Sequence, residues 1–508
     1  MHPISEIFPQ HHPTVNIKTL HPRSYQNPRK HKPASLKEAR LTSKKTLSVT
    51  GFARMGNRKP FLKDDSLDIS LSRQMGKQMA NKKPVLVIGA GIAGLQASLD
   101  LAKAGFSVYL VEEKPYLGGH VSLLCKVFPT FQDAKELLKP IIQSLIESPN
   151  VKTLAYSEIE KVEGAIGNFR IKVLKKARYV DEQKCTLCDE CAKVCPVNVS
   201  KDYEMGLGTR KAIYLPSPYP MPDKYLIDKQ TCLYFKDKSC HACRDACPEN
   251  AIVYDQASTE LELEADEIII ATGFKPYNAR KLGQYKYGIC KNVITGMEYE
   301  RLCALDGPTE GKIVRVDNRE KPKSVAYILC VGSREQRHLD YCCRVGCLNA
   351  LKHALTLKEQ YGSEAEAYIC YTDMRTVGKT GEKFYRKVRD SEVIFVHGEP
   401  SEIRETPDKS LTIDVYDQAT SKLLSITADL IVLETGLEPR VDLKDKLKIP
   451  LDESGFFKEA GHGLSTNETP IEGIFLAGTV QEPMNITETL THASAAAMKT
   501  ILQEKNLR

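Results

Sequence analysis

Two runs of cysteines near the middle of the chain constrain its fold more than any other feature. In the first run, gaps of two, two and three residues separate Cys185, Cys188, Cys191 and Cys195, and Pro196 follows. The second run has a longer first gap, of seven residues, and consists of Cys232, Cys240, Cys243 and Cys247, followed by Pro248. This spacing with a Cys-Pro ending is typical of bacterial ferredoxins, in which short loops wrap three thiolates around an iron–sulfur cube.

The same pattern predicts which cysteines share a cluster, because the fourth cysteine of each run ligates the cluster of the other run. We therefore expect two 4Fe–4S clusters. One is assigned to Cys185, Cys188, Cys191 and Cys247, and the other to Cys232, Cys240, Cys243 and Cys195. A zinc ribbon also uses paired cysteines, but it lacks the Cys-Pro ending. We expect this unit to span residues 178–255 and to interrupt a host domain between strands at 169–174 and 261–265.

The remaining composition excludes several classes of protein. The chain has 508 residues and 16 cysteines, whereas secreted disulfide scaffolds are short and cysteine-dense, so clustered cysteines favour metal and a reducing, cytoplasmic compartment. No apolar run approaches the roughly 18 residues of a membrane helix, so we expect no membrane span.

The formal charge of +7 is unevenly distributed along the chain. Residues 1–83 hold 17 Lys+Arg and 5 Asp+Glu, a net +12, which leaves 55 and 60, a net −5, for residues 84–508. A basic stretch with few large apolar residues cannot offset the entropy of ordering, so we expect residues 1–83 to be a disordered extension. A nucleic-acid-binding role would rest on this extension alone, and we do not predict one.

A dinucleotide-binding motif follows directly after this extension. A buried strand at 85–88 leads into Gly89, Gly91 and Gly94, then a helix at 95–104, a strand at 108–111 and Glu112. The first glycine permits the tight turn, the second lets backbone N–H groups approach a pyrophosphate, and the third packs helix against strand. Glu112 can accept hydrogen bonds from ribose hydroxyls.

Three further features favour FAD as the dinucleotide. Gly118 and Gly119 form a second glycine pair shortly after Glu112, as in FAD-binding oxidoreductases. Two strands end in Thr-Gly, at 267–273 with Thr272 and Gly273, and at 430–436. The segment 473–479, with Gly478, is typical of the last flavin-contacting strand of flavoproteins with two dinucleotide domains.

The expected second glycine motif, for a nicotinamide, is damaged. After the strand at 324–329 the turn has Cys330 in place of the first glycine and lacks the third, which removes both the tight turn and the close phosphate approach. Nicotinamide binding is therefore not predicted here. Four cysteines follow this strand within eighteen residues and could hold a third cluster or be buried small side chains: Cys330, Cys342, Cys343 and Cys347.

Taken together, the sequence over about residues 84–500 resembles the A-type subunits of heterodisulfide reductases and their homologues, which are FAD and iron–sulfur subunits of anaerobic electron-transfer complexes. Besides the glycine motifs, the resemblance rests on long motifs, at 128–130 (Phe-Pro-Thr), 167–169 (Gly-Asn-Phe), 178–180, 210–214, 307–311, 330–334 (Cys-Val-Gly-Ser-Arg) and 341–342.

The resemblance implies an α/β fold: a thioredoxin-reductase-like, Rossmann-type FAD module with an inserted two-cluster ferredoxin-like domain. The expected domains are the extension 1–83, FAD-binding parts at 84–177, 256–320 and 429–508, the insert at 178–255, and a second dinucleotide-like domain at 321–428.

In the family, the cysteine group after the altered turn ligates a further 4Fe–4S cluster beside the flavin. Here Gly346 stands where the family has its fourth cysteine, and Cys343 replaces a serine, so the resemblance makes Cys343 the candidate displaced ligand. Lys352 matches a family lysine that would lie near the flavin and shift its potential. From the sequence alone, a surface lysine on a helix is the simpler interpretation of Lys352.

The resemblance further implies an electron-transfer subunit whose partners are the other subunits of a heterodisulfide-reductase-like complex and a ferredoxin or a hydrogenase-type protein. The larger members perform flavin-based electron bifurcation. Two departures limit the analogy, since Asp133 and Glu136 stand where the family commonly has two cysteines, and no cysteines follow Cys370. Alternatives are an NAD(P)H-dependent oxidoreductase resembling the glutamate synthase small subunit, and a non-catalytic relay in a quinone-linked or sulfur-oxidising complex.

Overall fold

The computed structural model of the chain describes residues 83–461 and 467–506. The predicted basic extension lies, up to residue 82, outside the described residues. Within the described part, two five-stranded parallel sheets form the frame, and each is accompanied by a three-stranded antiparallel sheet. The α/β class predicted from the sequence is confirmed.

The first parallel sheet has the strand order β22-β11-β1-β2-β3. Its strands are β1 (Val85–Ile88), β2 (Val108–Glu112), β3 (Val151–Ala155), β11 (Ile268–Ile270) and β22 (Ile474–Leu476). The central strands β11, β1 and β2 consist almost entirely of Val, Ile and Leu, because other elements cover both faces of a parallel sheet. This sheet therefore carries the predicted motif, with β1 and β2 side by side.

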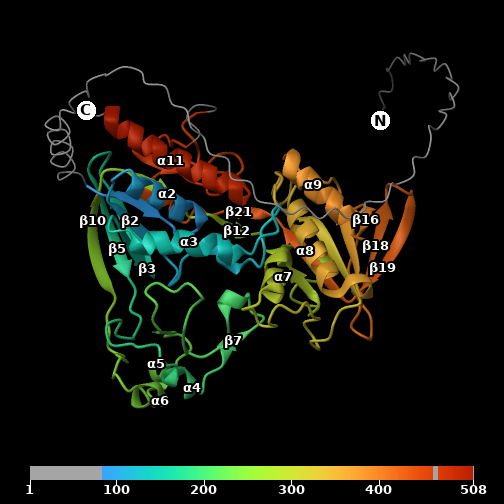
Figure 1. Ribbon diagram of the computed structural model, residues 1–508, viewed down its shortest axis with the longest axis horizontal. Helices are drawn as coiled ribbons and strands as arrows, with labels where there is room; N and C mark the ends of the chain where they lie inside the picture. The colour runs from blue at the N-terminus through green and yellow to red at the C-terminus, as the bar shows by residue number, and fades with distance from the viewer. Residues whose placement is uncertain (1–82, 462–466, 507–508) are drawn as a thin grey trace, which may run out of the picture. The chain divides into compact units, whose positions relative to one another are not determined.

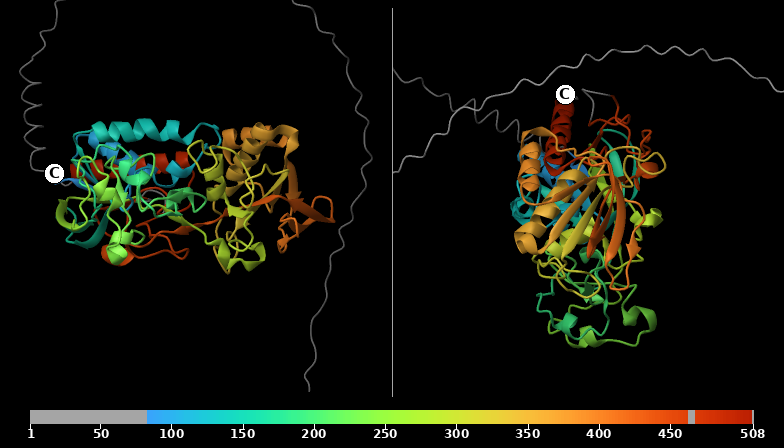
Figure 2. Two further views of the ribbon diagram at one scale, coloured as in Figure 1. Left: turned by 90° about the horizontal axis from the view of Figure 1, so that it is seen from below. Right: turned by 90° about the vertical axis from the view of Figure 1, so that its right-hand side faces the viewer.

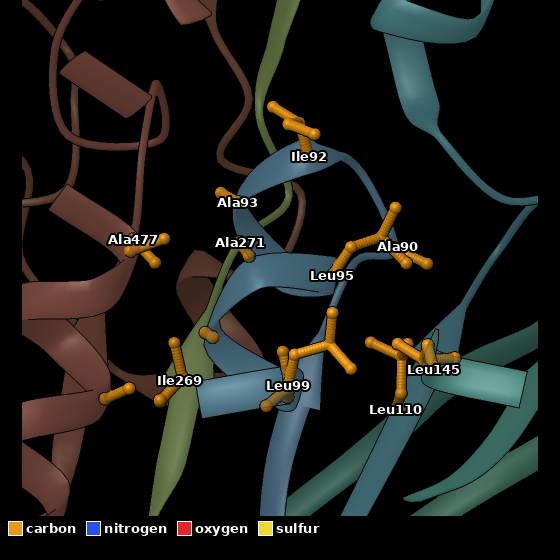
Figure 3. Packing of buried hydrophobic residues seen from close by; sticks show 14 of the residues in the cluster. Ala90, Ile92, Ala93, Leu95, Leu99, Leu110, Leu145, Ile269, Ala271 and Ala477 are labelled. Atoms are coloured by element: carbon orange, nitrogen blue, oxygen red, sulfur yellow. The ribbon is translucent and has the colours of Figure 1, made fainter. Parts of the chain in front are cut away.

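Three helices pack beside the first sheet, namely α2 (Ile92–Lys103), α3 (Ala134–Glu147) and α11 (Ile486–Asn506). The helix α2 contacts both α3 and α11, and Figure 1 shows the three labelled helices next to β2 and β3. Around the start of α2 the core includes the small side chains of Ala93, Ala271 and Ala477, which are labelled in Figure 3. Their small size allows α2 to begin close to the ends of β11 and β22.

An antiparallel sheet of β4 (Ser157–Glu163), β5 (Phe169–Lys175) and β10 (Thr259–Ala265) packs on the first sheet and carries the insert. In this sheet Lys175 lies opposite Thr259, so residues 176–258 leave and return at neighbouring points. These residues hold only short elements: α4 (Glu190–Lys193), α5 (Leu233–Asp237), α6 (Ala242–Asp245), the 3-10 helix η2 (Asp202–Glu204), the pair β6 (Val199–Ser200) and β7 (Thr209–Arg210), and the pair β8 (Ile213–Tyr214) and β9 (Leu226–Ile227).

The second parallel sheet has the order β13-β20-β14-β15-β16. Its strands are β13 (Val293–Thr295), β14 (Ser324–Val331), β15 (Glu366–Tyr371), β16 (Ile394–His397) and β20 (Leu430–Thr435). Helices α7 (Gly296–Cys303), α8 (Gly346–Tyr361) and α9 (Gly378–Arg389) belong to this unit, and Figure 2 shows α8 and α9 in orange on one face of the sheet. Its antiparallel sheet is β17 (Arg404–Glu405), β18 (Leu411–Asp417) and β19 (Lys422–Ala428).

The domain boundaries differ from the predicted ones. The strand β13 and the helix α7 fall in the range 256–320, and β20 falls in 429–508, both of which were assigned to the FAD module, yet all three belong to the second sheet and its layer. The chain passes between the two units through the antiparallel pair β12 (Phe274–Pro276) and β21 (Leu437–Pro439). The strand β20 resembled a flavin strand because it occupies in its own sheet the position that β11 occupies in the first.

Candidate functional site

Around the glycine turn after β1, the backbone is packed so tightly at Gly94 and Gly119 that only glycine fits there. A Cβ at Gly94 would lie 1.8 Å from the carbonyl oxygen of Gly89, and one at Gly119, which has φ +53°, would lie 2.9 Å from the Cα of Gly91. At Gly91 itself, no atom lies within 4 Å of an added Cβ, so this side of the turn faces open space. Gly91 is also the residue from which α2 begins, so the N–H groups of the first turn of α2 point to the same space.

A cleft of about 630 Å³ lies at this turn. Six of the predicted cofactor-binding residues line it: Gly89, Gly91, Glu112, Gly119, Thr272 and Gly273. The other three predicted glycines are not among its lining residues: Gly94, Gly118 and Gly478. These glycines allow close packing behind the wall of the cleft. At Gly478, an added Cβ would lie 2.9 Å from the side chains of both Ala93 and Thr489.

Glu112 is held rigidly at the end of β2. Its carboxylate accepts hydrogen bonds from the backbone N–H of Ala90 at 2.6 Å and from that of Lys114 at 2.8 Å. Burial raises the pKa of Glu112, and these backbone hydrogen bonds oppose that rise. The acid therefore ties the glycine turn to β2, and each oxygen keeps a further lone pair toward the cleft.

The donors and acceptors of the cleft fit an FAD. The hydroxyl of Thr272 is buried and has no hydrogen-bond partner among the described residues, so a ligand in the cleft would satisfy it. The N-terminus of α2 suits the pyrophosphate, and Glu112 suits the ribose. When bound, FAD exchanges electrons in pairs or singly, so it can join two-electron and one-electron carriers.

Two residues of the cleft wall carry no motif and were missed from the sequence. Arg440 lies in the cleft and forms an ion pair with Glu113, 327 residues away in the chain. His120 packs against the ring of Phe274 at 4.4 Å between centroids, and burial, with Arg440 and Lys114 nearby, lowers the pKa of His120 to about 4. The position of His120 directly after Gly119 is the one sequence signal that could have identified it.

The ferredoxin-like insert contributes to the same cleft. Asp202 and Met205 line it, together with the glycine turn of the first sheet. Between them, the Tyr203 hydroxyl donates to the carbonyl of Ser122 at 2.5 Å, and the buried Glu204 pairs with Arg301 at 2.9 Å. The insert is thus fixed against both parallel-sheet units where the cleft opens.

In the insert, the cysteines gather around two small cavities. One is lined by Cys185, Cys188, Cys191 and Cys247, and the other by Cys195, Cys232, Cys240 and Cys243. Each cavity thus combines three cysteines of one run with the fourth of the other. Among the described residues, no three His, Cys, Asp or Glu side chains converge on a single-ion position, and the thiols instead surround a shared space. Burial and the neighbouring thiols raise the pKa of Cys191 to about 12. The four thiols can therefore be thiolates together only when cationic iron balances their negative charge.

The cysteine group after β14 is also brought together. The thiols of Cys330, Cys342 and Cys347 are near enough to interact electrostatically, with Arg375 beside them. Cys343 is buried, and a hydrogen bond from its thiol is the main cause that lowers the pKa of Cys342 to about 5. An added Cβ at Gly346 would lie 3.1 Å from the Cys343 sulfur.

Lys352 is fully buried, which corrects the surface-lysine interpretation. From α8, its ammonium pairs with the buried Glu300 of α7 and donates to the carbonyl of Lys126 at 3.0 Å. His353 stands between two carboxylates, with Nε2 2.6 Å from Glu300 and Nδ1 2.8 Å from Glu434. We name Glu300, Lys352, His353 and Glu434 the buried charge cluster.

The buried charge cluster shifts the pKa values of its members. Burial alone would lower the pKa of His353, but Glu434 and Glu300 raise it to about 9, so the imidazole is a cation that donates from both nitrogens. Burial opposes ionisation of Glu300, yet the Lys352 ammonium and His353 hold the pKa of that carboxyl below its usual range. Lys352 is not among the residues that line the cleft, and its predicted contact with a flavin stays a prediction.

None of the helices in the described part of the chain is both long and apolar enough to cross a membrane.

Two family models match parts of the chain. One, described as FAD dependent oxidoreductase, matches residues 84–178, and one, described as 4Fe-4S binding domain, matches residues 178–200. They support an FAD-binding domain and at least one 4Fe–4S cluster.

Solved structures with a similar fold include the thioredoxin reductase of T. acidophilum, 16% identical with a TM-score of 0.46, over 84% of this chain and 99% of that one. The bacillithiol disulfide reductase Bdr of Bacillus cereus is 14% identical with a TM-score of 0.43, over 83% and 100%. These likenesses concern the fold alone.

Curated relatives are much closer in sequence. The A-type iron-sulfur subunit of the CoB–CoM heterodisulfide reductase of Methanocaldococcus jannaschii is 42% identical over 421 residues, which are 82% of this chain and 63% of the relative. The A-type subunit of the H(2)/formate:CoB-CoM heterodisulfide,ferredoxin reductase of Methanococcus maripaludis is 42% identical with the same coverage. The chain spans less than two thirds of the length of these relatives. Over the four fifths of its length that align, it is similar to the A-type subunits of heterodisulfide reductases.

Proposed function

We propose that this chain is the FAD- and 4Fe–4S-dependent electron-transfer subunit of a heterodisulfide-reductase-like oxidoreductase complex. The glycine turn, Glu112 and Thr272 would hold FAD in the cleft, where it would supply two-electron chemistry, and the two thiol sets of the insert would hold clusters that supply one-electron steps to partner subunits. The observation that carries this proposal is the shared wall of the cleft, to which the insert contributes Asp202 and Met205.

The path from cluster to cleft is short along the chain. Val197 lines the cavity of the second thiol set, and Asp202 lines the cleft. Five residue steps separate them, and an extended chain covers at most about 18 Å in five steps. We therefore propose that the cluster bound by Cys195 and its partners exchanges electrons with the flavin, and that the other cluster continues the path through the insert.

A third cluster is proposed for the cysteine group after β14. Its ligands are Cys330, Cys342, Cys347 and Cys343, with Cys343 in place of the cysteine that the family has at position 346. The close approach of the Cys343 sulfur to Gly346 supports this exchange, because a thiol on residue 343 reaches the space where a side chain on residue 346 would begin.

The proposed partners follow from the names of the relatives, which describe subunits of reductases for a heterodisulfide and ferredoxin, some with H2 or formate. We infer that this chain joins further subunits of such a complex and exchanges electrons with a ferredoxin or a hydrogenase-type protein. A cytoplasmic location is part of the same proposal. Purification of the native complex tests it, since a membrane quinone-reactive partner would instead favour the relay in a quinone-linked complex.

The number of clusters is tested by anaerobic quantification of iron, sulfide and flavin in the full chain. We expect about twelve irons per FAD, at four irons per cube, and about eight would contradict the third cluster. Cys343→Ser should lower the count by about four, whereas the matched control Cys290→Ser, a buried cysteine outside all three groups, should leave it unchanged.

The identity of the electron donor distinguishes the proposed function from that of an NAD(P)H-dependent oxidoreductase. The ring of the buried Tyr277 covers the turn after β14, where a nicotinamide dinucleotide would be expected to bind. An added Cβ at Gly332 in this turn would lie 2.4 Å from that ring. We expect NADPH to leave the flavin absorbance of the full chain unchanged. Reduced ferredoxin should bleach it and give electron paramagnetic resonance signals of reduced clusters. Rapid bleaching by NADPH would overturn the proposal.

A further inference from the structure

Three backbone groups next to the cleft are fixed by buried charged side chains. The carbonyl of Leu123 accepts from Arg301 at 3.1 Å, the N–H of Cys125 donates to Glu300 at 2.9 Å, and the carbonyl of Lys126 accepts from Lys352 at 3.0 Å. Leu123 itself lines the cleft and ends the 3-10 helix η1 (Gly119–Leu123). The position of Cys125 relative to α7 is therefore set by the hydrogen bonds on both sides of it.

A second cysteine lies on α7 next to Cys125. Cys303 follows Glu300 by three residues in this helix, so both side chains lie on the face that meets Cys125. The Cys125 thiol is close enough to Cys303 to raise the pKa of the Cys303 thiol. Cys125 is buried, Cys303 keeps some exposed surface, and neither is in a disulfide. The two cysteines are 178 residues apart in the chain and belong to none of the three proposed ligand sets.

The surroundings of this pair are polar, unlike those of an ordinary core cysteine. Cys370 is buried within the second sheet, where burial raises the pKa of its thiol to about 12. Burial, the Cys125 thiol and the Glu300 carboxylate raise the pKa of Cys303, and the Lys352 ammonium opposes that rise. An ammonium beside a thiol pair stabilises the thiolate that attacks a disulfide.

We propose that Cys125 and Cys303 form a redox-active dithiol that closes to a disulfide by exchange with a low-molecular-weight disulfide. Cys303, the more exposed of the two, attacks the external disulfide and releases one thiol; Cys125 then loses its proton, attacks the Cys303 sulfur and releases the second thiol. One S–S bond forms and one breaks, and two electrons and two protons pass to the external couple.

The closed disulfide would join the segment after η1 covalently to α7. Because η1 lines the cleft, oxidation would fix that wall of the cleft, and reduction would release it. In a reducing compartment such bonds are transient and serve catalysis or sensing. This site does not depend on the proposed electron-transfer function.

The test uses the full chain, purified anaerobically with its cofactors and incubated with mixtures of oxidised and reduced glutathione. After alkylation with iodoacetamide and proteolysis, mass spectrometry should find a peptide pair that links Cys125 to Cys303. The pair should disappear with dithiothreitol, and the number of alkylated thiols should fall by two on oxidation. Iron is counted in the same samples, so that cysteines released by cluster loss are recognised.

Matched variants decide the assignment. Cys125→Ser should abolish the link and trap a glutathione adduct on Cys303, Cys303→Ser should abolish both, and Cys370→Ser should retain the link. Full alkylation of Cys125 and Cys303 at every glutathione ratio, or linkage of either to another cysteine instead, would overturn the proposal. A stable glutathione adduct on Cys303 in the unaltered chain would do the same, because Cys125 would then have failed to resolve it.

Discussion

The two parallel-sheet units have the same design but different turns after their central strand. The strands β22, β11, β1, β2 and β3 correspond in order to β13, β20, β14, β15 and β16, and each unit adds a three-stranded antiparallel sheet. In the first unit, α2 begins at Ile92, directly after the glycine turn. In the second, residues 332–345 separate β14 from α8, and they carry Cys342 and Cys343.

The helix that follows the turn differs as much as the turn itself. The buried face of α2 consists of small and apolar residues, with Ser98 as its polar member. The buried face of α8 carries Lys352 and His353, which pair with Glu300 and Glu434. One scaffold therefore offers a cleft that fits a dinucleotide where its helix is apolar and its turn is glycine, and gathers thiols and charges where both have changed.

The largest expected effect is on the buried charge cluster. Glu300→Gln leaves the cations of Lys352 and His353 with Glu434 as their remaining carboxylate in the cluster, and loss of one partner of a buried ion pair costs roughly 3–5 kcal/mol. Urea unfolding should show this loss in the free energy of unfolding. The control Glu359→Gln removes an exposed pair with Lys126 at 3.1 Å and should cost less than about 1 kcal/mol. Equal losses in the two variants would show that the second unit does not depend on its buried charges.

The pH dependence of stability should sharpen the same contrast. The pKa of His353 is raised to about 9, above its ordinary value of 6.5, so its contribution to stability is complete below pH 6.5 and is lost as pH rises through about 9. A difference of that size corresponds to a contribution on the order of 3 kcal/mol. Unfolding midpoints should fall as pH rises from 6.5 through about 9, and His353→Gln should flatten that fall. A slope unchanged by the substitution would contradict the cationic His353.

A smaller effect is expected in the first unit. Gly91→Ala adds a methyl group that meets no protein atom within 4 Å, so folding should be unaffected, but the methyl group faces the space assigned to the pyrophosphate. We expect FAD affinity to fall about tenfold, or roughly 1.4 kcal/mol, measured by flavin retention and fluorescence titration. Gly283→Ala, which also meets no atom within 4 Å, is the control and should retain FAD. Normal FAD affinity in Gly91→Ala would place the pyrophosphate elsewhere.

Local pattern and cysteine spacing were enough for much of this structure. The strand, glycine turn, helix and strand from Val85 to Glu112 were identifiable because each element carries its own signal, and Thr272 and Gly273 line the cleft as expected. The partners of Lys352 could not be identified from the sequence, since Glu300 lies 52 residues away and the burial of Lys352 depends on how α7 and α8 pack. Arg440 and the pair of Cys125 and Cys303 were missed for the same reason: their roles arise from contacts between distant segments. The predicted boundaries of the second domain differ from the structure because β20 occupies in the second sheet the position that β11 occupies in the first.

The hairpin of β5 and β10 has a consequence for the maturation of the protein. Its seven paired residues bring Lys175 and Thr259 together, so the pairing of this sheet does not itself use residues 176–258. Because closing a longer loop adds little entropy cost, a host sheet can tolerate an insertion of this length. Backbone folding can thus precede delivery of iron and sulfide. We expect a cell short of either to accumulate folded protein that awaits its iron–sulfur cofactor, so that the supply of iron and sulfide sets how much of it becomes competent.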